Sequence, residues 1–140
     1  MATIQHLPSH IYVTRLDYGR LTNLVQQPQP ASLAELVTVL QQELKRAHLV
    51  DSYVILPHVV TMNSRLKLRK VGSDEELRFT LVYPPAADAA ERLSVLSPLG
   101  VAVLGCSLGD QFQLRQAEGL SSYWVEAILH QPEAAGDWDS

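Results

Sequence analysis

Basic side chains that could bind an anion are concentrated in one stretch of the sequence. The stretch holds five of the 11 lysines and arginines: Arg65, Lys67, Arg69, Lys70 and Arg78. Because Arg65, Lys67 and Arg69 alternate with apolar residues, a β-strand would place these three, the basic stripe, on one face. That face could hold a phosphate backbone or contact an acidic protein. The acidic turn 74–76 and the lack of interleaved aromatic residues favour a third interpretation, a solvated face of mixed charge.

The other reactive residue types do not form a catalytic pattern. The histidines are scattered, and none lies at a metal-ligand spacing from a carboxylate or cysteine: His6, His10, His48, His58 and His130. The sequence has neither a glycine-rich phosphate loop nor a nucleophile elbow. The single cysteine, Cys106, lies among apolar residues, which favours a core position over a reactive thiol. We therefore expect no metal, no cofactor and no enzyme activity.

Length and charge indicate an ordinary soluble protein. A chain of 140 residues can bury a core without disulfides or structural metals. The formal net charge of −4 argues against a protein that coats nucleic acid. The N-terminus lacks a basic region followed by an apolar run, and no stretch approaches about 18 consecutive apolar residues. We expect a cytoplasmic location.

Two helices are predicted in the first third of the chain, after a short extended run at 11–13. Thr14 followed by Asp17 has the spacing of a capping box and predicts a helix that ends before a proline-containing turn. Ser32 followed by Glu35 repeats this spacing, and apolar residues then recur every three or four positions to about residue 48. The short turn between them predicts an antiparallel helical hairpin. We expect its helices to pair through Leu21, Leu24, Leu36, Leu40 and Leu44.

From residue 57 onward the apolar residues recur at every second position, which is typical of strands. The expected strands are 59–62, 66–68, 77–83, 93–95, 112–114 and 123–129. Between them, Ser97 followed by Pro98 has the order of an N-cap and first helical residue, so a short helix should begin there. The fold class is therefore α+β, with an antiparallel sheet of about four to six strands. We place the helical hairpin in residues 1–52 and the sheet domain in residues 53–140.

Several stretches of the sequence resemble the Gre-like family of proteins that bind RNA polymerase. The first is LSVLSPLG at residues 93–100, followed by Gly109 and Asp110, a pattern similar to the C-terminal domain of the Gre transcript-cleavage factors. PHVVTMNSRLKLR at 57–69, LVYPPAAD at 81–88 and HQPEAAGDW at 130–138 extend the similarity. VVTMNS and QPEAAGD are the more specific pieces, and they resemble the branch of this family named for regulation of nucleoside diphosphate kinase.

The resemblance implies a helical hairpin shorter than that of the Gre factors, followed by an FKBP-like antiparallel domain with one short helix. It also implies that the protein binds bacterial RNA polymerase at the rim of its secondary channel and has no enzyme activity. By the same resemblance, the docking surface includes Leu96, Ser97, Pro98 and Leu99, where exposed leucines beside a fixed proline corner could accept a partner helix. The basic stripe is the next candidate contact.

The hairpin tip departs from the Gre pattern. Gre factors carry acidic residues there that help to hold a catalytic metal in the polymerase, a role that needs oxygen ligands. Here the tip, residues 26–31, reads QQPQPA and has no carboxylate, and Glu35 is expected to be engaged in the cap of the second helix. The resemblance thus implies occupation of the Gre site without transcript cleavage. An interaction protein that acts on nucleoside diphosphate kinase, or on another metabolic partner, is the alternative function.

Overall fold

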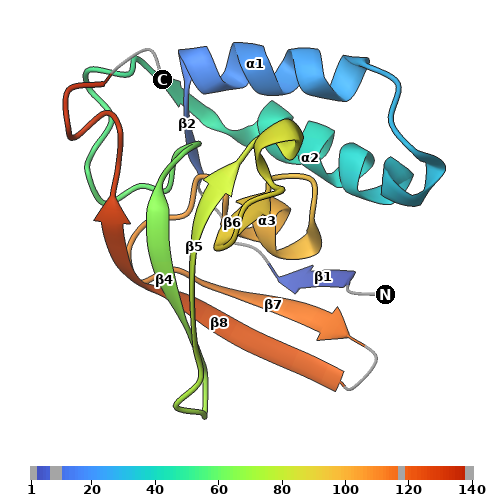
Figure 1. The fold of residues 1–140 in the computed structure, drawn as a ribbon, viewed down its shortest axis with the longest axis vertical. Coiled ribbons are helices and arrows are strands. Elements are labelled where there is room, and N and C mark those ends of the chain that lie inside the picture. The colour runs from blue at the N-terminus through green and yellow to red at the C-terminus, as the bar shows by residue number, and fades with distance from the viewer. Residues whose placement is uncertain (1–2, 7–10, 117–118, 138–140) are drawn as a thin grey trace.

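The computed structural model describes residues 3–6, 11–116 and 119–137 as a helical hairpin packed over a curled, mixed sheet (Figure 1). The hairpin helices α1 and α2 lie along one side of the molecule, and the short helix α3 lies between α2 and the strands β1 and β7. None of the helices in these residue ranges is long and apolar enough to cross a membrane.

The hairpin begins as the sequence predicts. Strand β2 (Tyr12–Thr14) leads directly into α1 (Arg15–Gln26), and the Thr14 hydroxyl accepts a hydrogen bond of 3.0 Å from the Asp17 backbone N–H. This bond satisfies one of the free N–H groups at the helix start. After α2 (Ala34–Arg46), strand β3 (His48–Val50) pairs in parallel with β2, a pairing that the sequence did not predict.

The predicted capping box at the start of α2 is wrong. Residues Ala31–Leu33 form a 3-10 turn, closed by a hydrogen bond of 2.9 Å from the Leu33 N–H to the Pro30 carbonyl. Ser32 therefore lies inside this turn rather than before the helix, and α2 begins after Leu33 without a side-chain cap. Glu35 is exposed in the first turn of α2 and is not engaged in a cap.

The main sheet has six strands in the order β1-β7-β8-β4-β5-β6. Their bounds are β1 Thr3–His6, β4 Arg65–Lys70, β5 Glu76–Val82, β6 Arg92–Ser94, β7 Gln111–Gln116 and β8 Gly119–His130. The predicted antiparallel arrangement is wrong at one edge, where β6 pairs in parallel with β5. The reason is the Pro84–Ala86 turn, η2: two successive prolines prevent a tight hairpin, and the chain runs back until Arg92 lies opposite Thr80, where β6 begins.

The predicted strand at 59–62 is not formed. Among the described residues it makes only an isolated bridge between Val59 and Ser107. Its backbone bonds go to other loops, since the Val60 N–H donates to the Cys106 carbonyl at 2.8 Å and the Gly105 N–H donates to the Val60 carbonyl at 3.0 Å. Asn63 then adopts a φ of 66°, which turns the chain toward β4.

A single apolar core joins the hairpin to the sheet. Leu21 from α1 and Leu40 from α2 are fully buried and belong to the same cluster as Leu66 of β4 and Phe112 of β7. Helix α3 (Pro98–Val103) contributes Val101 to this cluster. The hairpin is therefore part of the folded core: of the leucines predicted to pair, Leu21, Leu40 and Leu44 are buried in it and Leu24 and Leu36 are partly buried.

Replacing Leu40 with alanine should lower the free energy of unfolding by about 2–4 kcal/mol, because the change removes buried methyl groups and leaves a cavity. Urea titration of the parent and variant would measure this difference. Leu129→Ala is the matched control, since that leucine side chain is 47% exposed. A loss at Leu40 below about 0.5 kcal/mol would contradict the role of this residue in the core.

Candidate partner-binding surfaces and a buried polar junction

The corner between β6 and α3 is built by backbone and hydroxyl contacts. The Ser97 hydroxyl donates to the Ser94 carbonyl at 2.6 Å and accepts from the Gly100 N–H at 3.1 Å, which confirms the predicted N-cap. Pro98 occupies the first turn of α3, where its missing N–H costs nothing. A Cβ at Gly100 would lie 2.3 Å from the Ser94 carbonyl oxygen, so strand and helix touch here.

The structure corrects one part of the predicted docking surface. The corner was expected to display exposed leucines, but Leu96 is only 5% exposed and belongs to the core. Leu99 is half-buried and packs against the edge of that core. Ser97, Pro98 and Leu99 therefore remain as the accessible part of the corner, and its role in binding stays a prediction.

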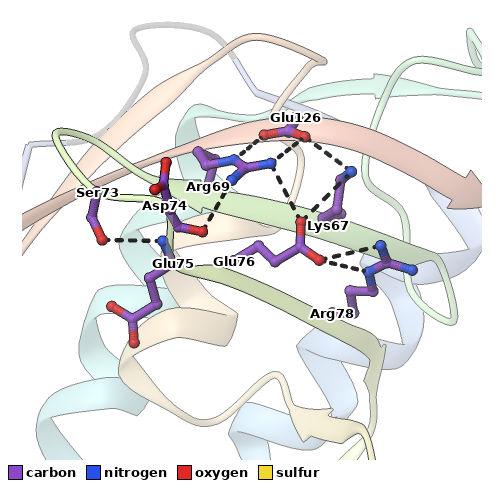
Figure 2. Close-up of polar contacts among 8 residues, drawn as sticks. All are labelled: Lys67, Arg69, Ser73, Asp74, Glu75, Glu76, Arg78 and Glu126. Atoms are coloured by element: carbon purple, nitrogen blue, oxygen red, sulfur yellow. Dashed lines mark hydrogen bonds and ion pairs between the residues drawn. The ribbon is translucent and has the colours of Figure 1, made fainter.

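The basic stripe lies on the outer face of the sheet, and its charges are paired within the protein (Figure 2). Glu126 of β8 forms ion pairs with Lys67 at 2.9 Å and with Arg69 at 2.5 Å. Glu76 of β5 lies 3.4 Å from Arg69 and 3.8 Å from Lys67, and it also pairs with Arg78 at 3.2 Å. At the ends of β4, Arg65 pairs with Glu91 and Lys70 with Glu75.

This ion-pair network changes the charge that the face presents. Hydrogen bonds from Arg69 and Lys67 lower the pKa of the Glu126 carboxyl from 4.5 to about 2, so it stays ionised at neutral pH. Three cations, Lys67, Arg69 and Arg78, are thus opposed by two carboxylates on adjacent strands. The sequence did not indicate Glu126, because it is 57 residues from Arg69 along the chain. Of the three interpretations of the stripe, the mixed-charge face fits this geometry best.

The hairpin tip displays amides and prolines rather than acids. The Gln29 side-chain amide donates to the Leu24 carbonyl at 3.2 Å and so closes the end of α1. The residues of the tip are otherwise mostly exposed. The first carboxylate after the tip is that of Glu35, which is exposed in the first turn of α2.

An apolar hollow of about 320 Å³ lies between the β2–β3 pair and the segment 54–59, and the sequence did not predict it. Its lining residues are Tyr12, Val50, Val54, Ile55, Leu56, His58, Val59 and Ser107. Val54 and Leu56 are more than half exposed, as is the adjacent Tyr53. The backbone beneath them is fixed, because the buried Gln131 side chain donates to the Leu56 and Val59 carbonyls at 2.8 Å each. The only signal in the sequence is the apolar run 53–60, which continues outside any periodic element.

A buried polar junction joins three segments that are distant in the sequence. The Met62 N–H donates to the carboxylate of Asp17 at 3.0 Å, which ties α1 to the turn 61–64. The Thr61 hydroxyl donates to the Glu133 carboxylate at 2.7 Å, which ties the same turn to the C-terminal segment. Within the turn, Ser64 accepts from the Thr61 N–H at 3.0 Å.

The junction perturbs two ionisable groups. Asp17 is 2% exposed, and this burial, together with the nearby Glu133 carboxylate, raises the pKa of Asp17 from 3.8 to about 7 against the lowering effect of the Met62 N–H. Burial also raises the pKa of the Tyr83 phenol, whose hydroxyl lies near Asp17 and Arg20. The sequence pattern identified Asp17 only through its backbone position in a helix cap and gave no sign of its side-chain partner.

Cys106 is confirmed as a core residue. Its thiol is fully buried and donates to the Ala102 carbonyl at 3.2 Å, and burial raises the pKa of the thiol well above its ordinary value. Thiolate formation at neutral pH is therefore suppressed. Among the described residues, no group of three or more histidine, cysteine, aspartate or glutamate side chains could hold a metal ion.

Comparison with known protein families matches most of the chain. The family model for the C-terminal part of the transcription elongation factors GreA and GreB matches residues 56–130, and the model for the Rnk N-terminus matches residues 10–50. The regulator of nucleoside diphosphate kinase of Escherichia coli strain K12 is 40% identical over 130 residues, which cover 91% of this chain and 95% of that protein. GreA of Clostridium acetobutylicum is 29% identical over 93 residues, or 66% of this chain and 59% of that protein.

A solved structure shares the fold. The transcription elongation factor GreA/GreB from Nitrosomonas europaea is 34% identical, has a TM-score of 0.72, and aligns over 88% of this chain and 100% of its own. The relatives are thus named as regulators and transcription factors. The match therefore extends from the hairpin through the sheet, and the chain belongs to the Rnk family, whose C-terminal part is that of the GreA and GreB transcription elongation factors.

Proposed function

We propose that this protein is a non-catalytic transcription regulator that binds bacterial RNA polymerase near the rim of the secondary channel. It occupies the site of the Gre factors there and does not stimulate transcript cleavage. The observation that carries the proposal is the combination of a Gre-type fold with a hairpin tip that has no carboxylate. The FKBP-like description of the sheet domain, the division at residue 52 and the cytoplasmic location belong to the same proposal.

The dimensions of the hairpin support this function. Helix α1 has 12 residues and α2 has 13, so each arm is roughly 18–20 Å long at about 1.5 Å per residue. The resemblance associates cleavage with acidic groups carried to a metal by the end of a longer hairpin. Here the end of the hairpin offers only neutral amides, which are weaker ligands for a divalent cation than carboxylates. Binding would then exclude a Gre factor without supplying its chemistry.

A second candidate function rests on the name of the Escherichia coli relative, regulator of nucleoside diphosphate kinase. In this case the chain binds the kinase, or another metabolic partner, through one of the surfaces described above. Purified kinase mixed with this protein would then transfer phosphate at a changed rate. If the rate stays constant and the two proteins do not co-elute, direct action on the kinase is excluded.

Adding the purified protein to a stalled elongation complex should leave RNA cleavage at its intrinsic rate, because no acidic group lies at the tip. In the same assay, increasing amounts of the protein should suppress the cleavage that a Gre factor stimulates. Gel analysis of the labelled transcript measures both effects. The proposal fails if cleavage rises in proportion to added protein. Loss of that cleavage in a Glu35→Gln variant would then identify the exposed carboxylate responsible.

The double variant Pro98→Ala with Leu99→Asp should weaken binding to polymerase core by at least about 2 kcal/mol, or roughly thirtyfold. It loses the fixed corner and places a charge where an apolar contact is expected. Competition titration against a labelled Gre factor measures the affinity, and circular dichroism and melting temperature check the fold.

Two leucine-to-aspartate controls separate the candidate surfaces in this experiment. Leu108→Asp changes an exposed leucine next to the apolar hollow, and Leu129→Asp changes one near the end of β8. Both variants should bind as the parent does. Weakening by Leu108→Asp with no effect of the corner variant would assign docking to the apolar hollow instead.

A further inference from the structure

The two sequence stretches that are most specific to this branch of the family meet in one place. VVTMNS at 59–64 supplies the Thr61 hydroxyl and the Met62 N–H, and QPEAAGD at 131–137 supplies Glu133 and Gln131. Asp17 of α1 accepts a hydrogen bond from the first stretch, and Glu133 of the second stretch lies near enough to raise the pKa of Asp17. Hydrogen bonds of the adjacent residues Thr61 and Met62 thus link three segments that are separated by 45 and 72 residues.

The charges around Asp17 do not neutralise it fully. The groups that face it are Glu133 from the C-terminal segment, the Tyr83 phenol from the end of β5, and Arg20 from the next turn of α1. The Met62 N–H and Thr14 hydroxyl complete its surroundings. Glu133 opposes ionisation of Asp17, whereas Arg20 and the two hydrogen bonds favour it. Because Asp17 is 2% exposed, water contributes little to stabilising its charge.

We propose that a proton on Asp17 controls how firmly the hairpin is held against the sheet at this junction. When Asp17 carries a proton, α1 is held firmly against the turn 61–64. When Asp17 is ionised, its buried charge is repelled by the nearby, partly exposed Glu133 carboxylate of another segment, and α1 separates from the turn more readily. The proposal does not depend on polymerase binding, since it concerns contacts within the protein alone.

The direction of the effect follows from linkage. In the closed structure the pKa of Asp17 is about 7, whereas an aspartate exposed to water has its ordinary pKa of 3.8. The closed state therefore binds the proton more tightly than an opened state does. The advantage of the closed state is complete below about pH 4, declines as the pH rises to about 7, and is constant above that.

The test uses the full-length protein. Carbon-13 NMR of the aspartate side chains should give Asp17 a titration midpoint near neutral pH. Amide hydrogen exchange, corrected for its intrinsic pH dependence, should show α1 opening at least tenfold more often at pH 8 than at pH 5.5. Asp17→Asn keeps an acceptor for the Met62 N–H but cannot ionise, so it should remove this pH dependence.

Two further variants complete the design. Glu133→Gln removes the neighbouring charge and should move the Asp17 midpoint to lower pH, a readout that remains available even if Asp17→Asn fails to fold. Asp51→Asn, at an exposed ion pair with Arg15, is the matched control and should leave α1 exchange as in the parent. The proposal is overturned if Asp17 titrates below about pH 5, or if α1 opening does not change between the two pH values in the parent.

Discussion

The continuous apolar core between the hairpin and the sheet is the constraint on which the rest of the structure depends. Helices of 12 and 13 residues are marginal in isolation, and most of their stability must come from packing. Leu21 and Leu40 supply it by joining the same cluster as Phe112 of the sheet. The position of the hairpin is therefore set by burial, and the polar contacts of the junction act within an interface that apolar packing has already defined.

The outer face of the sheet is organised by ion pairs between neighbouring strands rather than by apolar packing. Exposed ion pairs contribute little to stability, but pairs between neighbouring strands disfavour wrong registers. The pairing of β4 with β8 is irregular at two points, between Arg65 and Leu66 and between Lys67 and Leu68. Lys67 and Arg69 both reach Glu126 across this irregular pair. The basic residues Lys67 and Arg69 thus have a structural role, since they pair with a carboxylate on the neighbouring strand.

Local signals in the sequence predicted the local structure. Thr14 and Ser97 were identified as caps from their own neighbours, and the structure confirms both. The two hairpin helices and most strands were predicted from periodicity, and the short helix from the order of Ser97 and Pro98. Predictions failed where a distant partner decides the conformation: β3 forms because β2 lies beside it, and 59–62 bonds to the loop at 105–106 instead of a strand. Ser32 was misassigned because the 3-10 turn after Pro30 moves the helix start.

The same distinction applies to the candidate surfaces. The corner was identified as a surface by resemblance and its N-cap by adjacent residues, but neither indicated the burial of Leu96, which depends on packing in the core. The carboxylate partners of Arg69 and the surroundings of Asp17 lie on other elements. Spacing along the chain contains no information on such contacts, whereas the resemblance identified two of the stretches that meet at the junction, 59–64 and 131–137.

At Gly100 the backbone of α3 lies close to the backbone of residues 94 and 95, so a larger residue cannot replace this glycine. The atoms that a Cβ would meet include the Ser94 carbonyl oxygen at 2.3 Å and the Val95 Cα at 2.9 Å, and these backbone atoms cannot move aside by changing a rotamer. The path of the chain is therefore fixed, while the side chains at positions 98 and 99 are partly accessible. In evolutionary terms, the backbone of the corner is constrained while its side chains can be exchanged. Selection could therefore change a binding preference here without changing the fold.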